Sequence, residues 1–420
     1  MQKEKLNIIN LGCRLNIYEG EVIKSLASKN ELDNFTIINS CAVTQKAEKK
    51  VNYEIRKAKK KFPNKKIVLT GCAAQISPQK YAAMEEIDYV IGNNEKLDSK
   101  TWSSIKKSKS VQVKDIFENN DISHHLIEKF EGKARAFIEI QQGCDHRCTF
   151  CIIPFGRGNN RSIPVGVIIN RIKLLVQNGY KEVVLTGVDI TDYGKDLPGG
   201  PNLFQLVKRI LSLVPELKQL RFSSIDCAEI SSDFWPLLEN HRVMPHFHLS
   251  LQAGNDLILK RMKRRHTRKQ AIDFCHKVKK IRSDVVFGAD IIAGFPTETD
   301  EMFKESIKLI DECNLTHLHV FPFSPRQSTP AASMPQISKE VIKNRAKILR
   351  DCGNKNLSKY LNQQIGRKAT MLVEEVDPTG SYGKSQHFTK IHIDKELPKG
   401  LIVNCKIYKM NENILKAKLI

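Results

Sequence analysis

The chain has 420 residues, 11 cysteines and a net charge of +22, from 68 Lys and Arg against 46 Asp and Glu. Its length allows two or three domains with sizeable cores, and a hydrophobic content of 41% argues against a largely disordered chain. No apolar run reaches the roughly 18 residues of a membrane helix, and the N-terminus lacks the apolar stretch of a signal peptide. We therefore expect a cytoplasmic protein without a membrane partner, whose cysteines serve metals or catalysis before disulfides.

Residues 1–114 alternate short β-rich runs with helical stretches. The runs are LNIIN, FTIIN, KIVLTG and DYVIG, and the helical stretches between them include EVIKSLAS and VNYEIRKAKKK. This alternation predicts an α/β domain with a parallel sheet and helices on its faces. Residues 115–134 have no clear period and are predicted to be a linker.

Residues 135–360 repeat the alternation on a longer scale. Six β-rich runs, AFIEIQQ, KEVVLTG, QLRFSSI, HFHLSLQ, DVVFGADIIAGF and HLHVFPF, are separated by helical patterns such as VGVIINRIKLLVQNG. Six strand–helix units favour a barrel or partial barrel of parallel strands. Residues 363–420 lack a helical period, and their short strands and the turn signals DPTG and LPKG predict a small β-barrel.

The cysteines with the most informative spacing are Cys144, Cys148 and Cys151, directly after the strand AFIEIQQ. Three thiolates in one short loop can hold three irons of a four-iron cluster and leave the fourth open to a small chelating molecule. A zinc site is the alternative, because His146 could supply a fourth ligand.

A second set is formed by Cys13, Cys41 and Cys72. Each ends a β-run of the first region, so a parallel sheet would bring all three to its carboxyl edge, where ligands bind. Three unrelated buried cysteines are the alternative. The functional interpretation is a second four-iron cluster, again with one open iron.

The CxxxCxxC loop, with Phe150 directly before its last cysteine, resembles the radical S-adenosylmethionine (SAM) superfamily, which has a partial (β/α)6 barrel. The whole chain resembles the methylthiotransferases, and its tail takes the place of their RNA-binding TRAM domain. The matching motifs are LGCRLNIYEGE, INSCAVTQKAEKK, LTGCAAQ, GCDHRCTFCIIPFGRG, LTGVDI, LSLQAG, IIAGFPTET and FSPRQSTPA. The chain departs from the commoner PLQSG and GFPGET forms, which bears on cofactor contacts but leaves the cysteines untouched.

The resemblance is closest to the branch that acts on threonylcarbamoyladenosine. It implies methylthiolation of C2 of N6-threonylcarbamoyladenosine at position 37 of tRNA, with two [4Fe-4S] clusters and SAM as cofactors. The adenine C2–H is not acidic, which is why a radical generator is needed. The family also contains enzymes for isopentenyladenosine at the same position and for an aspartate of a ribosomal protein, and both stay as alternatives. An electron donor and a sulfur source, neither identified by the sequence, are further expected partners.

The resemblance also implies roles for individual residues. The two cysteine sets would hold the clusters, and Arg157 could meet the substrate's carboxylate or a phosphate, although a structural ion pair is the alternative. His246 and His248 alternate along one strand and are expected to line the barrel or its core. The residues expected to contact SAM, each of them alternatively a packing or local hydrogen-bonding residue, are Phe150, Gly187, Asp189, Ser224, Gln252 and Asp290.

The positive charge favours a polyanion, here the tRNA anticodon stem–loop, although Lys-rich usage on every solvated face is an alternative. Residues 46–66 carry ten Lys and Arg against two Glu, and residues 260–282 carry eleven against one Asp. The RNA contacts expected in the second block are Arg261, Lys263, Arg264 and Arg265. A non-catalytic RNA-binding metalloprotein is a rival of a different class. Ordinary packing is expected for Cys227, Cys275, Cys313, Cys352 and Cys405.

Overall fold

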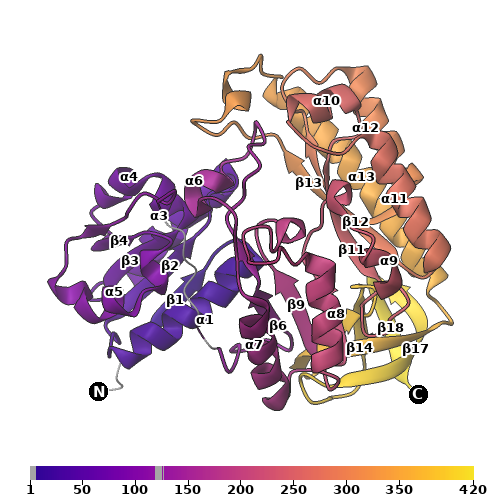
Figure 1. Cartoon of the computed structure of the whole chain (residues 1–420), viewed down its shortest axis with the longest axis horizontal. Helices are drawn as coiled ribbons and strands as arrows, with labels where there is room; N and C mark the ends of the chain where they lie inside the picture. Colours follow the sequence, from indigo (N-terminus) through magenta and orange to yellow (C-terminus); the bar gives the residue numbers. More distant parts are fainter. Residues whose placement is uncertain (1–5, 119–124, 126) are drawn as a thin grey trace.

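Three structural units follow one another along the chain. Figure 1 shows the N-terminal unit in indigo and purple, the central unit in magenta to orange, and the C-terminal unit in yellow. The computed structural model describes residues 6–118, 125 and 127–420. Of the predicted linker 115–134, residues 119–124 and 126 lie outside the described residues. The domain limits near 114, 135 and 360 stay predictions.

The N-terminal unit is a five-stranded parallel sheet in the order β1-β2-β3-β4-β5, which confirms the predicted α/β arrangement. The strands are β1 (Asn7–Asn10), β2 (Phe35–Ser40), β3 (Lys66–Gly71), β4 (Tyr89–Ile91) and β5 (Val111–Gln112). The helices are α1 (Arg14–Lys29), α2 (Gln45–Lys61), α3 (Cys72–Ile76), α4 (Pro78–Ala82) and α5 (Ser99–Ser104), with single turns η1 (Glu95–Leu97) and η2 (Ile105–Lys107). The sequence pattern missed β5, because two residues are too few to show an alternation.

The central unit is an open array of six parallel strands. Its two halves have the orders β10-β9-β6 and β11-β12-β13, and bridges from Leu220 to Val243 and from Ile225 to Leu249 join them. The strands are β6 (Ala136–Glu139), β9 (Glu182–Thr186), β10 (Gln219–Phe222), β11 (His246–Gln252), β12 (Val286–Ala293) and β13 (Leu315–Pro322). All six predicted strands are present, so the partial (β/α)6 barrel is confirmed.

Helices follow the barrel strands along the chain. The longer ones are α7 (Val165–Gln177), α8 (Leu203–Leu213), α11 (Arg268–Ile281), α12 (Asp300–Glu312) and α13 (Lys339–Gln363), with short α6 (Ile153–Arg157), α9 (Phe234–Leu237) and α10 (Asp256–Arg261). The shortest elements are β7 (Gln141–Gln142), β8 (Arg161–Ser162), η3 (Ile190–Asp192), η4 (Cys227–Glu229) and η5 (Pro330–Ser333). None of the helices in the described ranges is long and apolar enough to cross a membrane.

The C-terminal unit is a closed barrel in the order β14-β15-β16-β18-β17, as the turn-rich tail predicts. Its strands are β14 (Lys368–Asp377), β15 (Gly380–Ser385), β16 (Lys390–Ile393), β17 (Ile402–Asn411) and β18 (Ile414–Leu419). The sequence pattern did not single out β15, since GSYGKS has neither β-branched residues nor an apolar alternation. Met371, Val373 and Leu415 are fully buried in its core.

The N-terminal and central units share one hydrophobic core. Tyr18, Ile23 and Phe35 belong to the same buried cluster as Ile138 and Ile172. This shared core fixes the position of the N-terminal sheet edge against the barrel. The five cysteines expected to pack are buried or half-buried among apolar side chains, as that expectation requires: Cys227, Cys275, Cys313, Cys352 and Cys405.

Candidate metal centres and substrate cavity

The first cysteine set lies where three neighbouring parallel strands end. Cys41 and Cys72 directly follow β2 and β3, and Cys13 is the N-cap of α1, three residues after β1. The order β1-β2-β3 in the sheet therefore brings these three thiols to one edge, as predicted. Burial, followed by the neighbouring Cys72, raises the pKa of Cys41 to about 11, so its thiol is protonated at neutral pH until a metal displaces the proton.

Two glycines allow the close approach of these strand ends. Gly12 has φ +102°, and a Cβ there would stand 2.6 Å from the Cβ of Cys41. Gly71 has φ +93°, and its Cβ would collide with the backbone of Ser40. Only glycine adopts such conformations without strain while leaving this space free. These backbone conformations and close contacts explain why a glycine precedes both Cys13 and Cys72.

A buried polar cluster lies behind the first cysteine set. The carboxylate of Glu19 accepts hydrogen bonds from Arg157 at 2.8 Å and from Lys96 at 2.7 Å, and Arg157 also donates to Asn16 at 2.8 Å. Burial alone would raise the pKa of Glu19, but the charges of Arg157 and Lys96 outweigh it and lower this pKa to about 2. The amide of Asn93 faces the Cys72 sulfur at 3.7 Å. Contacts of this cluster help to position the cysteines, and its ion pair between Glu19 and Arg157 ties the N-terminal unit to the barrel.

The second cysteine set, Cys144, Cys148 and Cys151, occupies the loop between β7 and α6. Burial raises the pKa of each thiol, that of Cys151 to about 12. The guanidinium of Arg264 lies 3.8 Å from the sulfur of Cys148 and pairs with Asp226 at 2.6 Å. A cation beside this sulfur favours the thiolate that a metal needs.

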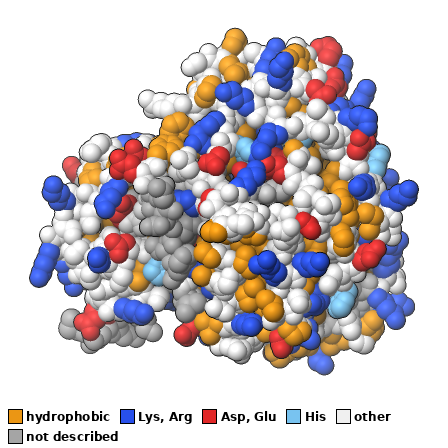
Figure 2. All heavy atoms as spheres, in the orientation of Figure 1, with side chains coloured by type: hydrophobic (Ala, Val, Ile, Leu, Met, Phe, Trp, Pro, Cys, Tyr) orange, Lys and Arg blue, Asp and Glu red, His pale blue; other side chains and the backbone are white. Residues whose placement is uncertain are grey.

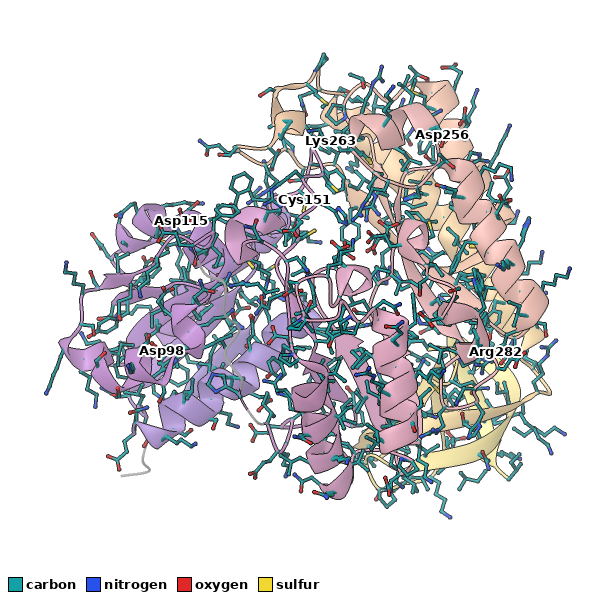
Figure 3. The ribbon with its side chains drawn as sticks, viewed as in Figure 1. Asp98, Asp115, Cys151, Asp256, Lys263 and Arg282 are labelled. Carbon is teal, nitrogen blue, oxygen red and sulfur yellow. The ribbon has the colours of Figure 1, made fainter. Side chains whose placement is uncertain are left out.

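Helix α6 connects the two cysteine sets. It begins two residues after Cys151 and packs on α3, the helix that Cys72 starts. A Cβ on Gly156 would stand 3.2 Å from the Cβ of Cys72 and 3.5 Å from its sulfur. Figure 3 shows Cys151 between the N-terminal unit and the barrel, with Lys263 on a neighbouring segment. The fold therefore holds both sets at one boundary.

The donor arrangement fits multi-iron clusters better than single metal ions. A tetrahedral zinc site with Zn–S bonds of about 2.3 Å would place its ligand atoms within about 4 Å of one another. In the part of the chain that the structure describes, the sets of three or more His, Cys, Asp or Glu ligand atoms within 4.8 Å of one another include none of the six cysteines. His146 faces Asp189 at 3.0 Å instead of completing a zinc site with the loop.

Those compact sets lie elsewhere in the site. They are Asp226 with Cys227 and His266, His248 with Asp290 and His319, and His146 with Asp189, Asp192 and Glu229. The oxygen of Asp290 already pairs with His248 at 2.8 Å and with His319 at 3.2 Å. Burial, followed by the neighbouring acids Asp192 and Asp226, raises the pKa of Asp189 to about 6.

A cavity of about 830 Å³ opens where all three units meet. Its lining includes Cys13 and Cys41 from the N-terminal unit, Gly187, Ser224 and Asp290 from the barrel, and Phe388 from the C-terminal unit. A smaller cavity of about 180 Å³ is lined by Phe150, Gln252 and again Asp290. Five of the six residues expected to contact SAM thus line one of two cavities that share Asp290, and the sixth, Asp189, lies beside the cysteine loop.

The expected substrate contact of Arg157 is not supported by its position. Its side chain is only 2% exposed and is fully engaged with Glu19, Asn16 and Gln142, which favours the structural ion pair that the sequence left open. The expected RNA contacts also differ among themselves. Arg264 pairs with the buried Asp226, and Arg261 donates to Thr297, whereas Lys263 and Arg265 are exposed, Arg265 with an ion pair to Glu229. Figure 2 shows Lys and Arg spread over this face rather than gathered in one patch.

Several residues of the site escaped the sequence analysis. His317 and His319 line the large cavity in ring contact with His246 and His248, which line it as expected. The spacing of His317 and His319 in THLHV repeats that of the two histidines in HFHLS, and this repetition was the available signal. Arg14, Lys384 and Phe388 also line the cavity, but only the tertiary structure brings β15 and its following loop to the end of α1.

Comparisons with known proteins agree with this geometry. Residues 138–310 match the Radical SAM superfamily, and residues 5–92 match a family described as Uncharacterized protein family UPF0004. The "Threonylcarbamoyladenosine tRNA methylthiotransferase MtaB" of Rickettsia prowazekii is 50% identical over 98% of this chain and 97% of its own length. The protein of the same description from Aquifex aeolicus is 32% identical over 88% of this chain and 93% of its own length.

A comparison with a solved structure of low sequence identity supports the fold and nothing further. The radical SAM methyltransferase TsrM of Kitasatospora setae, solved with tryptophan and a SAM analog, superposes with a TM-score of 0.58 at 12% identity. The match covers 78% of this chain and 75% of TsrM.

Proposed function

The chain belongs to the radical SAM methylthiotransferase family, and from this premise we propose that it transfers a methylthio group to C2 of N6-threonylcarbamoyladenosine at position 37 of tRNA. The observation that carries the proposal is the 50% identity to a threonylcarbamoyladenosine tRNA methylthiotransferase over nearly the whole of both chains. The two cysteine sets at the boundary of the barrel support it, because this reaction needs two metal centres near one substrate.

In this proposal Cys144, Cys148 and Cys151 hold one [4Fe-4S] cluster, and the N-terminal set of Cys13, Cys41 and Cys72 holds the other. When bound, the clusters and SAM supply the radical and sulfur chemistry that an unreactive C2–H requires. The protein's own part is to fix the sulfurs, orient the base and exclude water. The shared core and the Glu19 cluster fix the sulfurs, and the walls of the large cavity orient the base and limit the access of water to it.

We assign SAM to the space beside the cysteine loop. Phe150 packs edge-on against Phe295, with ring centres 6.4 Å apart, and can support an adenine ring. A Cβ on Gly187 would press against Gln141 and Ile190, so the glycine keeps the backbone open at the end of β9. Gln252, with φ +69° at the end of β11, presents its side chain to the small cavity.

The macromolecular partner in this proposal is the anticodon stem–loop, in the cytoplasm where tRNA is modified. A base in a single-stranded loop can be turned out into a deep pocket for chemistry. The C-terminal barrel supplies one wall of that pocket, and the exposed lysines of α2 and Lys263 offer phosphate contacts. An electron donor and a sulfur source complete the reaction.

Mass spectrometry of tRNA nucleosides from a strain without this gene tests the proposal. We expect 2-methylthio-N6-threonylcarbamoyladenosine to disappear and to return with the wild-type gene but not with Cys148→Ala. Persistence of that nucleoside in a strain without a paralogue would overturn the proposal. Loss of the 2-methylthio form of isopentenyladenosine, or of a methylthio increment on a ribosomal protein, would assign the chain to the corresponding other branch.

A further inference from the structure

Two cations in the large cavity, Arg14 and Lys384, form no direct ion pair within the part of the chain that the structure describes. Arg14 follows Cys13 directly and lines the cavity, and its side chain makes no hydrogen bond or ion pair with any residue that the structure describes. Its guanidinium lies 5.8 Å from the centre of the Phe388 ring. Lys384 lines the same cavity and lies 4.8 Å from the same ring centre; its ammonium forms no ion pair with a described residue, although Glu374 attracts it from farther away.

The neighbouring arginines, in contrast, are paired. Arg135 and Arg221 share the buried carboxylate of Glu182, and Arg135 also pairs with Glu374. Arg221 additionally donates to the carbonyl oxygens of Ser385 and Gln386, at 2.9 Å each. Four cations, including Arg14 and Lys384, thus face two carboxylates around Phe388, which leaves an excess of two positive charges (four minus two).

The other described charged residues of the cavity form no ion pair with either cation, and Asp290 acts on Arg14 only through a longer-range electrostatic attraction. Asp290 is held by His248 and His319, and Glu412 lies exposed at the rim beside the exposed Lys390. Arg14 and Lys384 are half-buried, and a partly desolvated charge without an ion-pair partner costs free energy, as in sites that receive an anion. The ring of Phe388, stacked on His246 at 5.2 Å, gives the same region an aromatic wall.

The substrate of the proposed function carries a matching group. N6-threonylcarbamoyladenosine differs from adenosine by a threonyl unit with a free carboxylate, and a carboxylate taken out of water needs charged hydrogen-bond donors. Resting on the proposed function, we propose that Arg14 and Lys384 form an anion subsite that receives this carboxylate. They then select this nucleoside over one with an uncharged N6 substituent, since an unpaired Arg14 would oppose an isopentenyl group.

The test compares two synthetic anticodon stem–loops with the reconstituted full-length enzyme. One carries N6-threonylcarbamoyladenosine, and the other carries the same nucleoside with its carboxylate converted to a primary amide. Because hydrogen bonds to charged groups are worth about 1.5–3 kcal/mol, we expect Arg14→Gln to lower kcat/KM for the carboxylate substrate about 10- to 100-fold. For the amide substrate it should change kcat/KM by less than about threefold, and Arg14→Lys should recover part of the loss.

Three further measurements keep the outcomes distinct. Iron content shows whether the cluster beside Arg14 is retained, and Lys384→Gln, far from any predicted cluster ligand in the sequence, carries the test if it is not. Lys406, exposed on β17 of the same small barrel and not in the cavity lining, is the matched control, and Lys406→Gln should affect both substrates equally. If Arg14→Gln and Lys384→Gln also affect both substrates equally, the cations bind an RNA phosphate and the subsite is overturned. If the wild type modifies neither stem–loop, it is the proposed function that fails.

Discussion

The two cysteine sets reach the same boundary by different routes. Cys144, Cys148 and Cys151 lie within eight residues of one loop, so the local chain alone brings them together. Cys13, Cys41 and Cys72 are spread over 60 residues and meet only because β1, β2 and β3 are neighbours in one parallel sheet. The set in the loop, which we call the loop set, therefore depends on local sequence, and the set at the sheet edge, the sheet set, depends on the tertiary fold.

The surroundings of the two sets also differ: those of the sheet set come from two structural units, and those of the loop set come from one. The sheet set rests on the buried cluster of Glu19, Lys96 and Arg157, which spans two structural units. The loop set has Arg264 and Asp226 beside it, both from the barrel. Damage to the core should therefore affect the sheet set first.

The largest expected effect is the loss of activity when one cysteine of either set is removed, and it distinguishes the functions of the two sets. Cys148→Ala should abolish both methylthiolation and cleavage of SAM to 5'-deoxyadenosine, with iron falling from about eight to about four per chain. Cys41→Ala should lose a similar amount of iron and all methylthiolation but keep SAM cleavage. Iron analysis and chromatography of the reaction products measure both. Equal loss of SAM cleavage in the two variants would break the division of roles.

The next effect concerns the Glu19 cluster. Glu19→Gln leaves Arg157 and Lys96 buried without their carboxylate and should lower the free energy of unfolding by about 3–5 kcal/mol. Urea denaturation measures it. The matched control is Lys269→Ala, which removes an exposed pair with Asp273 and should cost about 0.5 kcal/mol or less. A loss below 1 kcal/mol for Glu19→Gln would show that water or relaxation compensates the buried cations.

A smaller effect is expected from the glycine next to Cys13. Gly12→Ala forces a side chain into φ +102° and against Cys41, so it should reduce iron at the sheet set while SAM cleavage persists. Gly166→Ala in α7 is the control, because its Cβ meets no atom within 4 Å. Unchanged iron in Gly12→Ala would mean that the sheet edge can open without loss of the cluster.

The smallest effect is the pH dependence of the same ion-pair cluster. The pKa of Glu19 is lowered from 4.5 to about 2 by Arg157 and Lys96, against the effect of burial. Its stabilisation is therefore fully present above about pH 4.5 and is lost as the pH falls toward 2. The stability difference between wild type and Glu19→Gln should shrink across that range in urea titrations. A difference that stays constant down to pH 3 would contradict the pairing.

Much of this protein could be predicted from its sequence, because local patterns carry the information. Six barrel strands, the α/β first unit and the C-terminal barrel follow from periodicity and turn residues. The short spacing of Cys144, Cys148 and Cys151 in one loop is enough by itself to bring the three thiols together. The ends of three parallel strands also sufficed to predict that Cys13, Cys41 and Cys72 converge.

Only the tertiary structure decided which polar residues serve the site. A sequence shows that Arg157 is charged, but not that Glu19 from 138 positions away neutralises it in the core. It shows Arg264 within a basic block, but not that this side chain turns inward to Cys148. Arg14 and Lys384 meet around Phe388 because three units pack together, and no short-range pattern encodes that meeting. Charge identity is local, whereas charge pairing depends on the packing of distant segments.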